Sequence, residues 1–317
     1  MSSDSIVPPG SASSPPVWAL AIHGGAGAGR QEAGAEALDA EIRDALAAVL
    51  AAGAQRLAAG ESALDAVEGA VVRLEDSPLF NAGKGAVFNE RGEHELDASI
   101  MDGAALRAGA VAGVRTLKNP IRGARLVLER SPHVLLIGDG AESFAKGLGA
   151  ETVEPGYFGT ARREAALEEA RRRAALSPPP GETGTVGAVA LDLHGNLAAA
   201  TSTGGVTNKA VGRVGDSALI GAGTFASNAS CAVSCTGQGE IFIRATAARD
   251  VAALMEYQGL GVEAAAERVI RQRVAGLRGE GGLIAVDVRG RVAFAFNTKL
   301  MMRGKVTSRS APWVALY

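Results

Sequence analysis

Two long stretches in the first quarter of the chain carry apolar residues at the spacing of amphipathic helices. The pattern predicts helices over residues 37–60 and 62–78. Gly60 ends the first helix, and Ser62 stands where it can cap the second. The same spacing predicts further helices over residues 119–131, the second part of 133–149, the charged stretch from 161, residues 246–259 and residues 261–277.

Dense or alternating apolar runs predict strands between these helices. A buried strand is expected over 17–27, and paired strands over 94–103 and 105–114 around Asp102-Gly103. Further strands are predicted over 185–205 (two strands around the turn "HGN"), 215–227, 231–244 and 281–298, where a last hairpin finishes the chain. Strands and helices are grouped rather than alternating, which favours an α+β fold with sheets packed face to face and helices outside.

Two segments are expected to lie outside the packed core. Residues 1–16 have neither a positively charged start nor an apolar run, so they predict a disordered tail rather than a signal peptide, with the cytoplasm as the default location. Residues 160–184 begin as a charged helix and end in three prolines and glycines, which predicts a flexible linker that ends at Gly184.

The composition excludes several classes of function. The chain has 317 residues, of which 47% are apolar and 21% charged, with a net charge of −2. It has no basic surface for nucleic acid, no polybasic membrane patch and no apolar run long enough to span a membrane. Aromatic residues make up 4% of the chain against 42 glycines, which predicts a close-packed interior of small residues.

Cysteine and histidine residues give no metal-binding pattern. Cys231 and Cys235 would lie roughly 13 Å apart along a strand, too far for a disulfide, and are predicted to be buried thiols. The four histidines, His23, His94, His133 and His194, form no cluster with ligand spacing. Metal catalysis is therefore not expected.

Two glycine-rich segments could approach a ligand. "HGGAGAGR" (23–30) follows a strand but has Arg30 where a dinucleotide-binding turn needs its third glycine, and it has no lysine for a phosphate loop. A close approach of its backbone to another part of the protein is the better interpretation. "LEDSPLFNAGKGAVFNERG" (74–92) could fold its carbonyls around a hard cation or could simply join a helix to a strand, and both readings stay open.

Thr185 stands directly after Gly184 and directly before a dense apolar strand. A threonine hydroxyl becomes a useful nucleophile when a base takes its proton, and the smallest such base is the residue's own α-amino group. That amine exists only if the Gly184–Thr185 bond is cut, and the preceding linker gives the bond slack. The pattern alone also fits a β-branched residue that merely opens a strand.

Residues downstream favour the nucleophile. "TSTGG" (201–205), "GRVGDS" (212–217) and "SCTGQGE" (234–240) place hydroxyl and charged groups among glycines. Arg213 can hold a carboxylate through its planar fork, and Asp216 can hold an ammonium. Thr236 and the N–H of Gly237 can donate to an oxyanion. The first pair suits an amino-acid head group, and the second suits amide hydrolysis.

These motifs, together with "HGGAG", "NAGKGAVF", "HELDASIMDG" and "GTVGAVALD", resemble the plant-type L-asparaginases, also called isoaspartyl peptidases. That family belongs to the N-terminal-nucleophile hydrolases. The resemblance runs from about Trp18 to Asn297. It implies a four-layer αββα sandwich and a precursor that cuts itself into an alpha chain (17–184) and a beta chain (185–317) of one domain. It also implies a dimer of such heterodimers that acts on asparagine and β-aspartyl dipeptides without a catalytic cofactor.

The resemblance also assigns roles to single residues. It implies that Thr185 is the nucleophile, that Thr203 tunes it and that Asn81 supports it. Thr236 and Gly237 would stabilise the oxyanion. Substrate binding would fall to Arg213, Asp216, Gly237 and Gly239. A structural sodium ion would be bound by the carbonyls of Leu74, Glu75, Ser77, Phe80, Ala82 and Lys84.

Two positions depart from the family pattern, and three rival readings are weighed. Lys299 and Leu300 follow "FNT" where bacterial members often have an acidic residue and glycine, and Lys84 stands at an often apolar position, where an inward ammonium would repel the cation. A glycosylasparaginase would typically need a secretion signal, and a dinucleotide-binding protein would need the missing third glycine. An unprocessed, non-enzymatic homologue would leave Arg213 and Asp216 unexplained.

Overall fold

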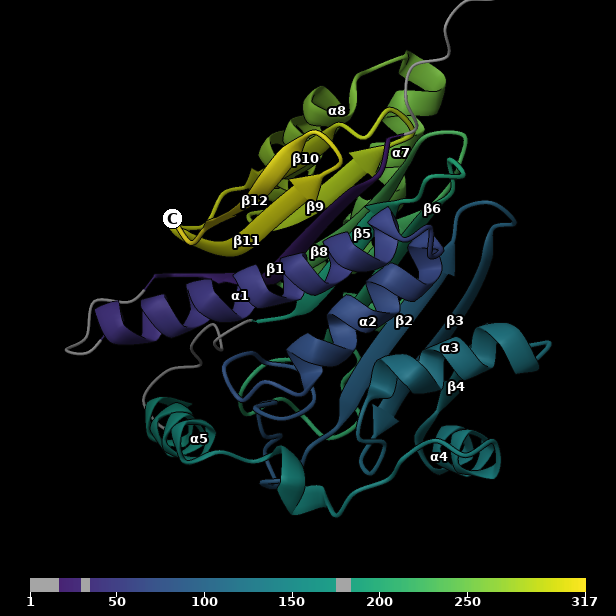
Figure 1. The fold of residues 1–317 in the computed structure, drawn as a ribbon. Coiled ribbons are helices and arrows are strands. Elements are labelled where there is room, and N and C mark those ends of the chain that lie inside the picture. The colour runs from purple at the N-terminus through teal and green to yellow at the C-terminus, as the bar shows by residue number, and fades with distance from the viewer. Residues whose placement is uncertain (1–16, 30–34, 175–183) are drawn as a thin grey trace, which may run out of the picture.

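Two β-sheets stack on each other in the structure, a computed structural model that describes residues 17–29, 35–174 and 184–317 (Figure 1). The larger sheet has the strand order β12-β11-β1-β5-β6-β2-β3-β4, and the smaller sheet has the order β10-β9-β8-β7. Neighbouring strands are antiparallel except for the parallel pair β3 and β4. The strands are β1 (Ala19–Gly27), β2 (Leu96–Asp102), β3 (Arg107–Val114), β4 (Leu135–Ile137), β5 (Val186–Leu191), β6 (Leu197–Thr203), β7 (Thr224–Ala226), β8 (Cys231–Gly237), β9 (Gly281–Asp287), β10 (Val292–Phe296), β11 (Leu300–Thr307) and β12 (Ser310–Ala315).

Helices cover the outer faces of both sheets. Figure 1 shows α1, α2 and α3 across the face of the larger sheet, while α7 and α8 pack on the smaller sheet. The helices are α1 (Ala35–Ala58), α2 (Ala63–Glu75), α3 (Pro120–Arg130), α4 (Gly138–Gly147), α5 (Ala161–Ala174), α6 (Gly239–Ala245), α7 (Ala247–Gln258) and α8 (Val262–Arg268). Short turns of other helix types are η1 (Pro155–Phe158), η2 (Asp216–Ala218) and η3 (Val269–Val274), of which the last is a π-helix that continues α8. The described residues thus form a mixed α+β fold.

The apolar core is divided into three buried clusters. One lies between the larger sheet and its helices, with Leu46 and Phe80 among its members, and a second lies between the smaller sheet and α7 and α8. The third lies between the two sheets and contains mainly small side chains, such as Ala199 and Ala232. Small residues allow the two sheets to approach closely, as the glycine- and alanine-rich composition predicts.

Several predictions from the sequence are confirmed. Ser62 caps α2, because its Oγ accepts a hydrogen bond from the Asp65 N–H at 3.1 Å. The paired strands around Asp102-Gly103 are β2 and β3, and those around "HGN" are β5 and β6. Cys231 and Cys235 are free, buried thiols on β8, and burial raises the pKa of the Cys231 thiol to about 12.

Two predicted strands are wrong in part. Over 231–244, the strand β8 ends at Gly237 and the helix α6 begins at Gly239, so the apolar residues after Gly239 belong to a helix. Over 215–227, the strand is limited to the three residues of β7, and Asp216–Ala218 form the turn η2. In both places a short apolar run fitted helix and strand equally well.

The chain does not finish with the hairpin over 281–298. Two more strands, β11 and β12, follow it at one edge of the larger sheet, where β11 pairs with both β1 and β12. Arg303 and Lys305 interrupt the apolar pattern of β11 and so hid this strand. The side chain of Arg303 is nevertheless buried, with its guanidinium 4.5 Å from the centre of the Phe296 ring.

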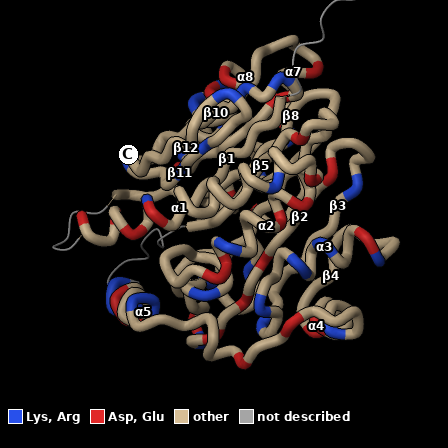
Figure 2. The backbone as a smooth tube through the Cα atoms, in the orientation of Figure 1, with Lys and Arg blue, Asp and Glu red and all other residues tan. Residues whose placement is uncertain are grey.

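Charged side chains concentrate on the outer helices, α5 most densely, and are sparse on the strands (Figure 2). Of the segment expected as a linker, about 160–184, residues Ala161–Ala174 form α5 and residues 175–183 lie outside the described residues. The expected tail, 1–16, also lies outside them. Among the helices that the structure describes, none is long and apolar enough to cross a membrane.

Candidate active site

Thr185 lies at the start of β5, near the middle of the larger sheet, and is almost completely buried. The neighbouring strand β6 runs antiparallel and ends at Thr203, which places the two threonines side by side. The Thr185 hydroxyl donates to Thr203 Oγ1 at 3.4 Å. The hydroxyl of Thr185, the predicted nucleophile, therefore donates to Thr203, the second threonine predicted to act on it.

The carbonyl oxygen of Gly184, in the peptide bond that would be cut, accepts two hydrogen bonds. Asn81 Nδ2 donates to it at 2.8 Å and Thr203 Oγ1 donates at 2.9 Å. Asn81 is itself fixed, because it also donates to the Gly205 carbonyl at 2.7 Å and accepts from the Val87 N–H at 2.9 Å. Two fixed donors on one carbonyl polarise it and would stabilise negative charge on its oxygen.

The glycine-rich turn after β1 presses against the same peptide bond. Gly25 has a φ of +116°, and a Cβ on it would lie 3.2 Å from Gly184 Cα and 3.3 Å from Thr185 N. Any larger residue would be strained and would crowd the reacting bond. The close backbone approach predicted from "HGGAGAGR" is thus present at Gly25, and residues 30–34 lie outside the described residues.

A buried polar chain runs between the sheets from the Thr185 carbonyl to the Ser217 carbonyl. His23 contacts the Thr185 carbonyl through Nδ1 at 3.0 Å and Ser234 Oγ through Nε2 at 2.9 Å. Burial lowers the pKa of His23 to about 3, so the ring is neutral at pH 7. The remaining links are Ser234–Thr201 (2.7 Å), Thr201–Thr224 (2.6 Å), Thr224–Ser99 (2.8 Å) and Ser99 to the Ser217 carbonyl (2.6 Å).

This polar chain has one hydrogen too few. Its six successive contacts join two carbonyl acceptors through one neutral imidazole and four hydroxyls, which together carry five hydrogens. Sequence reasoning missed the role of His23, which was considered only as a metal ligand. The glycine at position 187 is related to this contact, because a Cβ there would lie 2.0 Å from Ser234 Oγ and 2.5 Å from His23 Nε2 and would push them apart.

The predicted head-group residues and the nucleophile line one narrow cavity. Its lining residues are Thr185, Thr203, Gly205, Val206, Arg213, Gly215, Asp216, Ser217 and Gly237. Asn81 and Thr236 lie behind the lining and reach it through their neighbours.

Asp216 and Arg213 differ in how they are partnered. The carboxyl of Asp216 is buried, and its Oδ2 has no hydrogen-bond partner among the described residues. Burial raises the pKa of this carboxyl to about 7. The guanidinium of Arg213 forms a bidentate pair with Glu240, at 2.8 Å from Nε and 3.0 Å from Nη2. A carboxylate is therefore already seated on the fork that was predicted to bind one, although sequence reasoning did not identify Glu240.

Gly237 and Gly239 frame the floor of the cavity between β8 and α6. A Cβ on Gly239 would lie 2.8 Å from Arg213 Nη2 and 3.1 Å from Asp216 Oδ1, so a side chain there would displace the head-group residues. Thr236 Oγ1 accepts from the Ala26 N–H at 3.2 Å, which leaves its own hydrogen to be donated elsewhere. Five of the predicted residues thus line one cavity, and the other three, Asn81, Thr236 and Gly239, lie next to residues of its lining.

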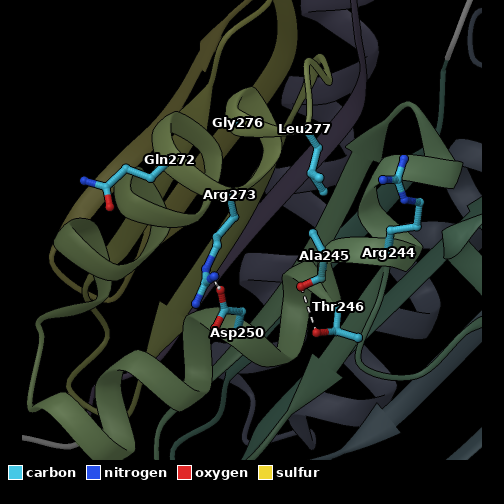
Figure 3. A pocket seen from close by; sticks show the side chains of 8 residues that line it. All are labelled: Arg244, Ala245, Thr246, Asp250, Gln272, Arg273, Gly276 and Leu277. Atoms are coloured by element: carbon cyan, nitrogen blue, oxygen red, sulfur yellow. Dashed lines mark hydrogen bonds and ion pairs between the residues drawn. The ribbon is translucent and has the colours of Figure 1, made fainter.

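A second, wider hollow of about 490 Å³ lies between α6, α7 and η3 (Figure 3). Arg273 reaches across it to Asp250 at 3.1 Å, and Arg244 points along another wall. None of the predicted site residues lines this hollow.

Comparison with known proteins gives the family. A family model described as "Asparaginase" matches residues 16–316. The chain belongs to the asparaginase family. It is 54% identical to the "Isoaspartyl peptidase" of Escherichia coli (strain K12), over 94% of this chain and 95% of that protein. It is 45% identical to the "Isoaspartyl peptidase/L-asparaginase" of Mus musculus (98% and 91%) and 43% identical to the "Probable isoaspartyl peptidase/L-asparaginase 2" of Arabidopsis thaliana (95% and 99%).

The asparaginase family's expected cation loop, residues 74–84, is tightly folded in this chain. Carbonyl oxygens converge at its end, because a Cβ on Gly85 would lie 2.6 Å from the Pro78 oxygen and 2.7 Å from the Phe80 oxygen. The Glu75 carbonyl accepts from the Lys84 N–H at 2.7 Å, while the Glu75 side chain points away to Ser202. The Pro78 carbonyl also accepts from Arg162 Nη2 at 3.2 Å, and the sodium site stays a prediction.

The two departures from the family pattern have different surroundings. The ammonium of Lys84 lies 5.5 Å from the centre of the Tyr157 ring, where it makes a cation–π contact. Leu300 is the first residue of β11 and is buried, and neither it nor Lys299 lines the cavity beside Thr185.

Proposed function

We propose that this chain is a self-cleaving amidohydrolase that converts L-asparagine and β-aspartyl dipeptides to L-aspartate. The observation that carries the proposal is the single small cavity in which a buried threonine faces one cationic and one anionic side chain. A zwitterionic amino acid needs both charges, and its side-chain carbonyl then points at the threonine. The names of the curated relatives, which describe isoaspartyl peptidases and asparaginases, support the same activity.

Self-cleavage is the first step of the proposed mechanism. Thr185 Oγ1 attacks the Gly184 carbonyl carbon, and Asn81 and Thr203 stabilise the oxyanion. The peptide C–N bond breaks, the released amine gains a proton, and an ester joins Gly184 to Thr185 Oγ1. Water hydrolyses this ester, which leaves a carboxylate on Gly184 and frees the hydroxyl and α-amine of Thr185.

Substrate hydrolysis repeats this chemistry with the freed amine as base. An unperturbed α-amine has a pKa of about 7.7–8.0, so a useful fraction is neutral near pH 7. The amine takes the Thr185 hydroxyl proton, and Oγ1 attacks the β-carbonyl. Thr236 and Gly237 stabilise the oxyanion. The leaving group, which is ammonia from asparagine or the amine of the second residue from a β-aspartyl dipeptide, takes the proton from the Thr185 ammonium and departs. Water then hydrolyses the resulting ester to aspartate.

The head group would be held by charge. Arg213 binds the α-carboxylate and Asp216 binds the α-ammonium, with Gly239 leaving room for both. Glu240 must leave Arg213 when substrate enters, and its side chain is 62% exposed, so it can move into water. The α-carboxylate of the substrate then takes the place of the Glu240 carboxylate on Arg213, at little electrostatic cost because both groups carry the same charge.

The remaining features follow from family membership and are proposed on that basis. The two sheets and their helices correspond to the αββα sandwich of N-terminal-nucleophile hydrolases. The carbonyls of residues 74–84 would hold a sodium ion that stiffens the loop carrying Asn81. No catalytic cofactor is needed, because protein groups supply the nucleophile, base and oxyanion donors. Assembly as a dimer of heterodimers and a cytoplasmic location stay predictions.

The substrate linkage tests the proposal. In an α-linked Asp-Leu peptide the α-carboxylate is consumed in the peptide bond, so Arg213 would face a neutral carbonyl. A site built for a charged group strongly rejects an analogue that lacks it. We expect HPLC to show cleavage of asparagine and β-Asp-Leu and none of α-Asp-Leu. Comparable turnover of the α-linked peptide would refute the head-group assignment, and inactivity on all three would refute the function.

A further inference from the structure

Ser217 has a buried hydroxyl that the proposed mechanism does not use. The residue is 1% exposed and lines the cavity beside Thr185. Its Oγ has no hydrogen-bond partner among the described residues. Buried hydroxyls in proteins are normally partnered, so an unpartnered one that lines a ligand cavity calls for a ligand atom.

The backbone of Ser217 is held in place, which fixes the point from which its side chain starts. The Ser217 carbonyl accepts from Ser99 Oγ at 2.6 Å and from Thr224 Oγ1 at 3.4 Å. Both hydroxyls belong to the buried polar chain between the sheets. The unpartnered hydroxyl is therefore presented by a rigid element, the turn η2, and not by a loose loop.

The adjacent residue carries a matching unpartnered atom. Asp216 lines the same cavity, and its buried Oδ2 also has no partner among the described residues. The two atoms come from consecutive residues, and both can accept a hydrogen bond. An ionised carboxyl oxygen can only accept, whereas the Ser217 hydroxyl can accept or donate, so a ligand group that satisfies both must supply at least one donor. An ammonium offers three, while a carboxylate offers none.

We propose that Ser217 Oγ is a second acceptor for the substrate's α-ammonium, beside Asp216, and so determines specificity for substrates with a free α-amine. This inference rests on the proposed function. The three N–H groups of an ammonium point in different directions. A carboxylate and a hydroxyl together can therefore accept from them with better geometry than a carboxylate alone. The Ser217 hydroxyl keeps its own hydrogen, which has no acceptor among the described residues.

The test compares Ser217→Ala with Ser217→Thr, which keeps the hydroxyl. Hydrogen bonds to charged groups are among the stronger ones in proteins. We expect Ser217→Ala to raise the KM for asparagine by roughly 10- to 100-fold while kcat stays within about twofold. Ser217→Thr should recover most of this loss. Ser230→Ala is the matched control, because Ser230 is also buried but bonds to Glu256 away from the cavity, at 2.9 Å.

Two product analogues separate ammonium binding from a merely structural role. L-aspartate has the α-ammonium and succinate lacks it, and both can be measured as competitive inhibitors. Ser217→Ala should weaken inhibition by L-aspartate by about the same factor as KM and leave inhibition by succinate within about twofold. Where succinate is too weak to measure, the split between KM and kcat decides, because a distorted site would lower kcat as well.

Three results would overturn the inference while the wild-type protein still hydrolyses asparagine. The first is an unchanged KM in Ser217→Ala. The second is equal weakening of L-aspartate and succinate, which would assign the hydroxyl to the carboxylate or to the fold. The third is a fall in kcat with no change in KM. A wild-type protein that does not hydrolyse asparagine would instead refute the proposed function itself.

Discussion

The two walls of the cavity beside Thr185 are built on opposite principles. The nucleophile wall (Thr185 and Thr203, with Asn81 and His23 behind them) has hydrogen-bond partners for each of its side-chain polar atoms. The head-group wall (Arg213, Asp216, Ser217 and Gly239) has unpartnered atoms on Asp216 and Ser217, and its Arg213 is paired with an exposed glutamate. The chemistry is thus set up before substrate arrives, whereas the recognition groups are completed by the substrate. Catalytic donors act best when they are preorganised, and binding groups discriminate best when a wrong ligand leaves them unpaired.

Breaking the nucleophile wall should have the largest effect. Asn81→Ala removes one of two donors to the Gly184 carbonyl, and loss of such a donor costs roughly 10²–10³ in rate. We expect self-cleavage to slow by that factor in a time course of intact mass. Asn89→Ala is the control, since Asn89 is a buried asparagine that holds the adjoining turn through the Arg91 and Glu93 N–H groups. Equal slowing in both variants would assign the effect to folding.

Breaking the head-group wall should spare self-cleavage. Arg213→Lys keeps the charge and loses the bidentate fork. We expect normal cleavage at Gly184 and a fall in kcat/KM of roughly 10- to 1000-fold with β-aspartyl substrates, equal to about 1.4–4 kcal/mol. Unchanged kinetics would remove Arg213 from the binding site, and failure to self-cleave would contradict the separation of the two walls.

The pH dependence of binding should report on Asp216. Burial raises the pKa of this carboxyl to about 7 in the free protein, and an ammonium binds its ionised form. Substrate binding below pH 7 must therefore release a proton, so the KM for asparagine should rise as pH falls through 7, approaching about tenfold per unit. A KM that stays flat from pH 8 to pH 5.5 would contradict an unpaired buried carboxyl.

The smallest effect is expected inside the polar chain behind the nucleophile wall. Thr224→Val removes one hydroxyl, two of the six contacts of the chain and the 3.4 Å contact to the Ser217 carbonyl, and the four contacts of the chain that remain have four hydrogens. Its free energy of unfolding should therefore change by less than about 0.5 kcal/mol, although losing a buried hydroxyl commonly costs about 1–3 kcal/mol. Ser202→Ala should show that larger cost in the same denaturant titration, because Ser202 donates to the buried Glu75 carboxyl at 2.6 Å.

Sequence reasoning located the cavity because its residues stand in short motifs punctuated by glycine. Thr185, Arg213 and Asp216 could each be assigned a chemistry from their own neighbours in the chain. His23 could not, because its role depends on Thr185 and Ser234, which are 162 and 211 residues away. The pairing of Arg213 with Glu240 could not be predicted either, because no sequence pattern shows which carboxylate will form an ion pair with a given guanidinium. The strand β11 escaped because Arg303 interrupts its apolar alternation while stacking on aromatic rings of other strands.

The intact mass of the purified protein tests the central claim most directly. If Thr185 is a nucleophile that must first free its own amine, the wild-type protein should give two polypeptides that meet at Gly184 and Thr185, and Thr185→Ala should stay one chain of 317 residues. Both samples should be incubated and measured side by side, with asparagine hydrolysis assayed on each. A wild-type chain that hydrolyses asparagine while remaining uncut, or a Thr185→Ala chain that splits at the same bond, would contradict the account.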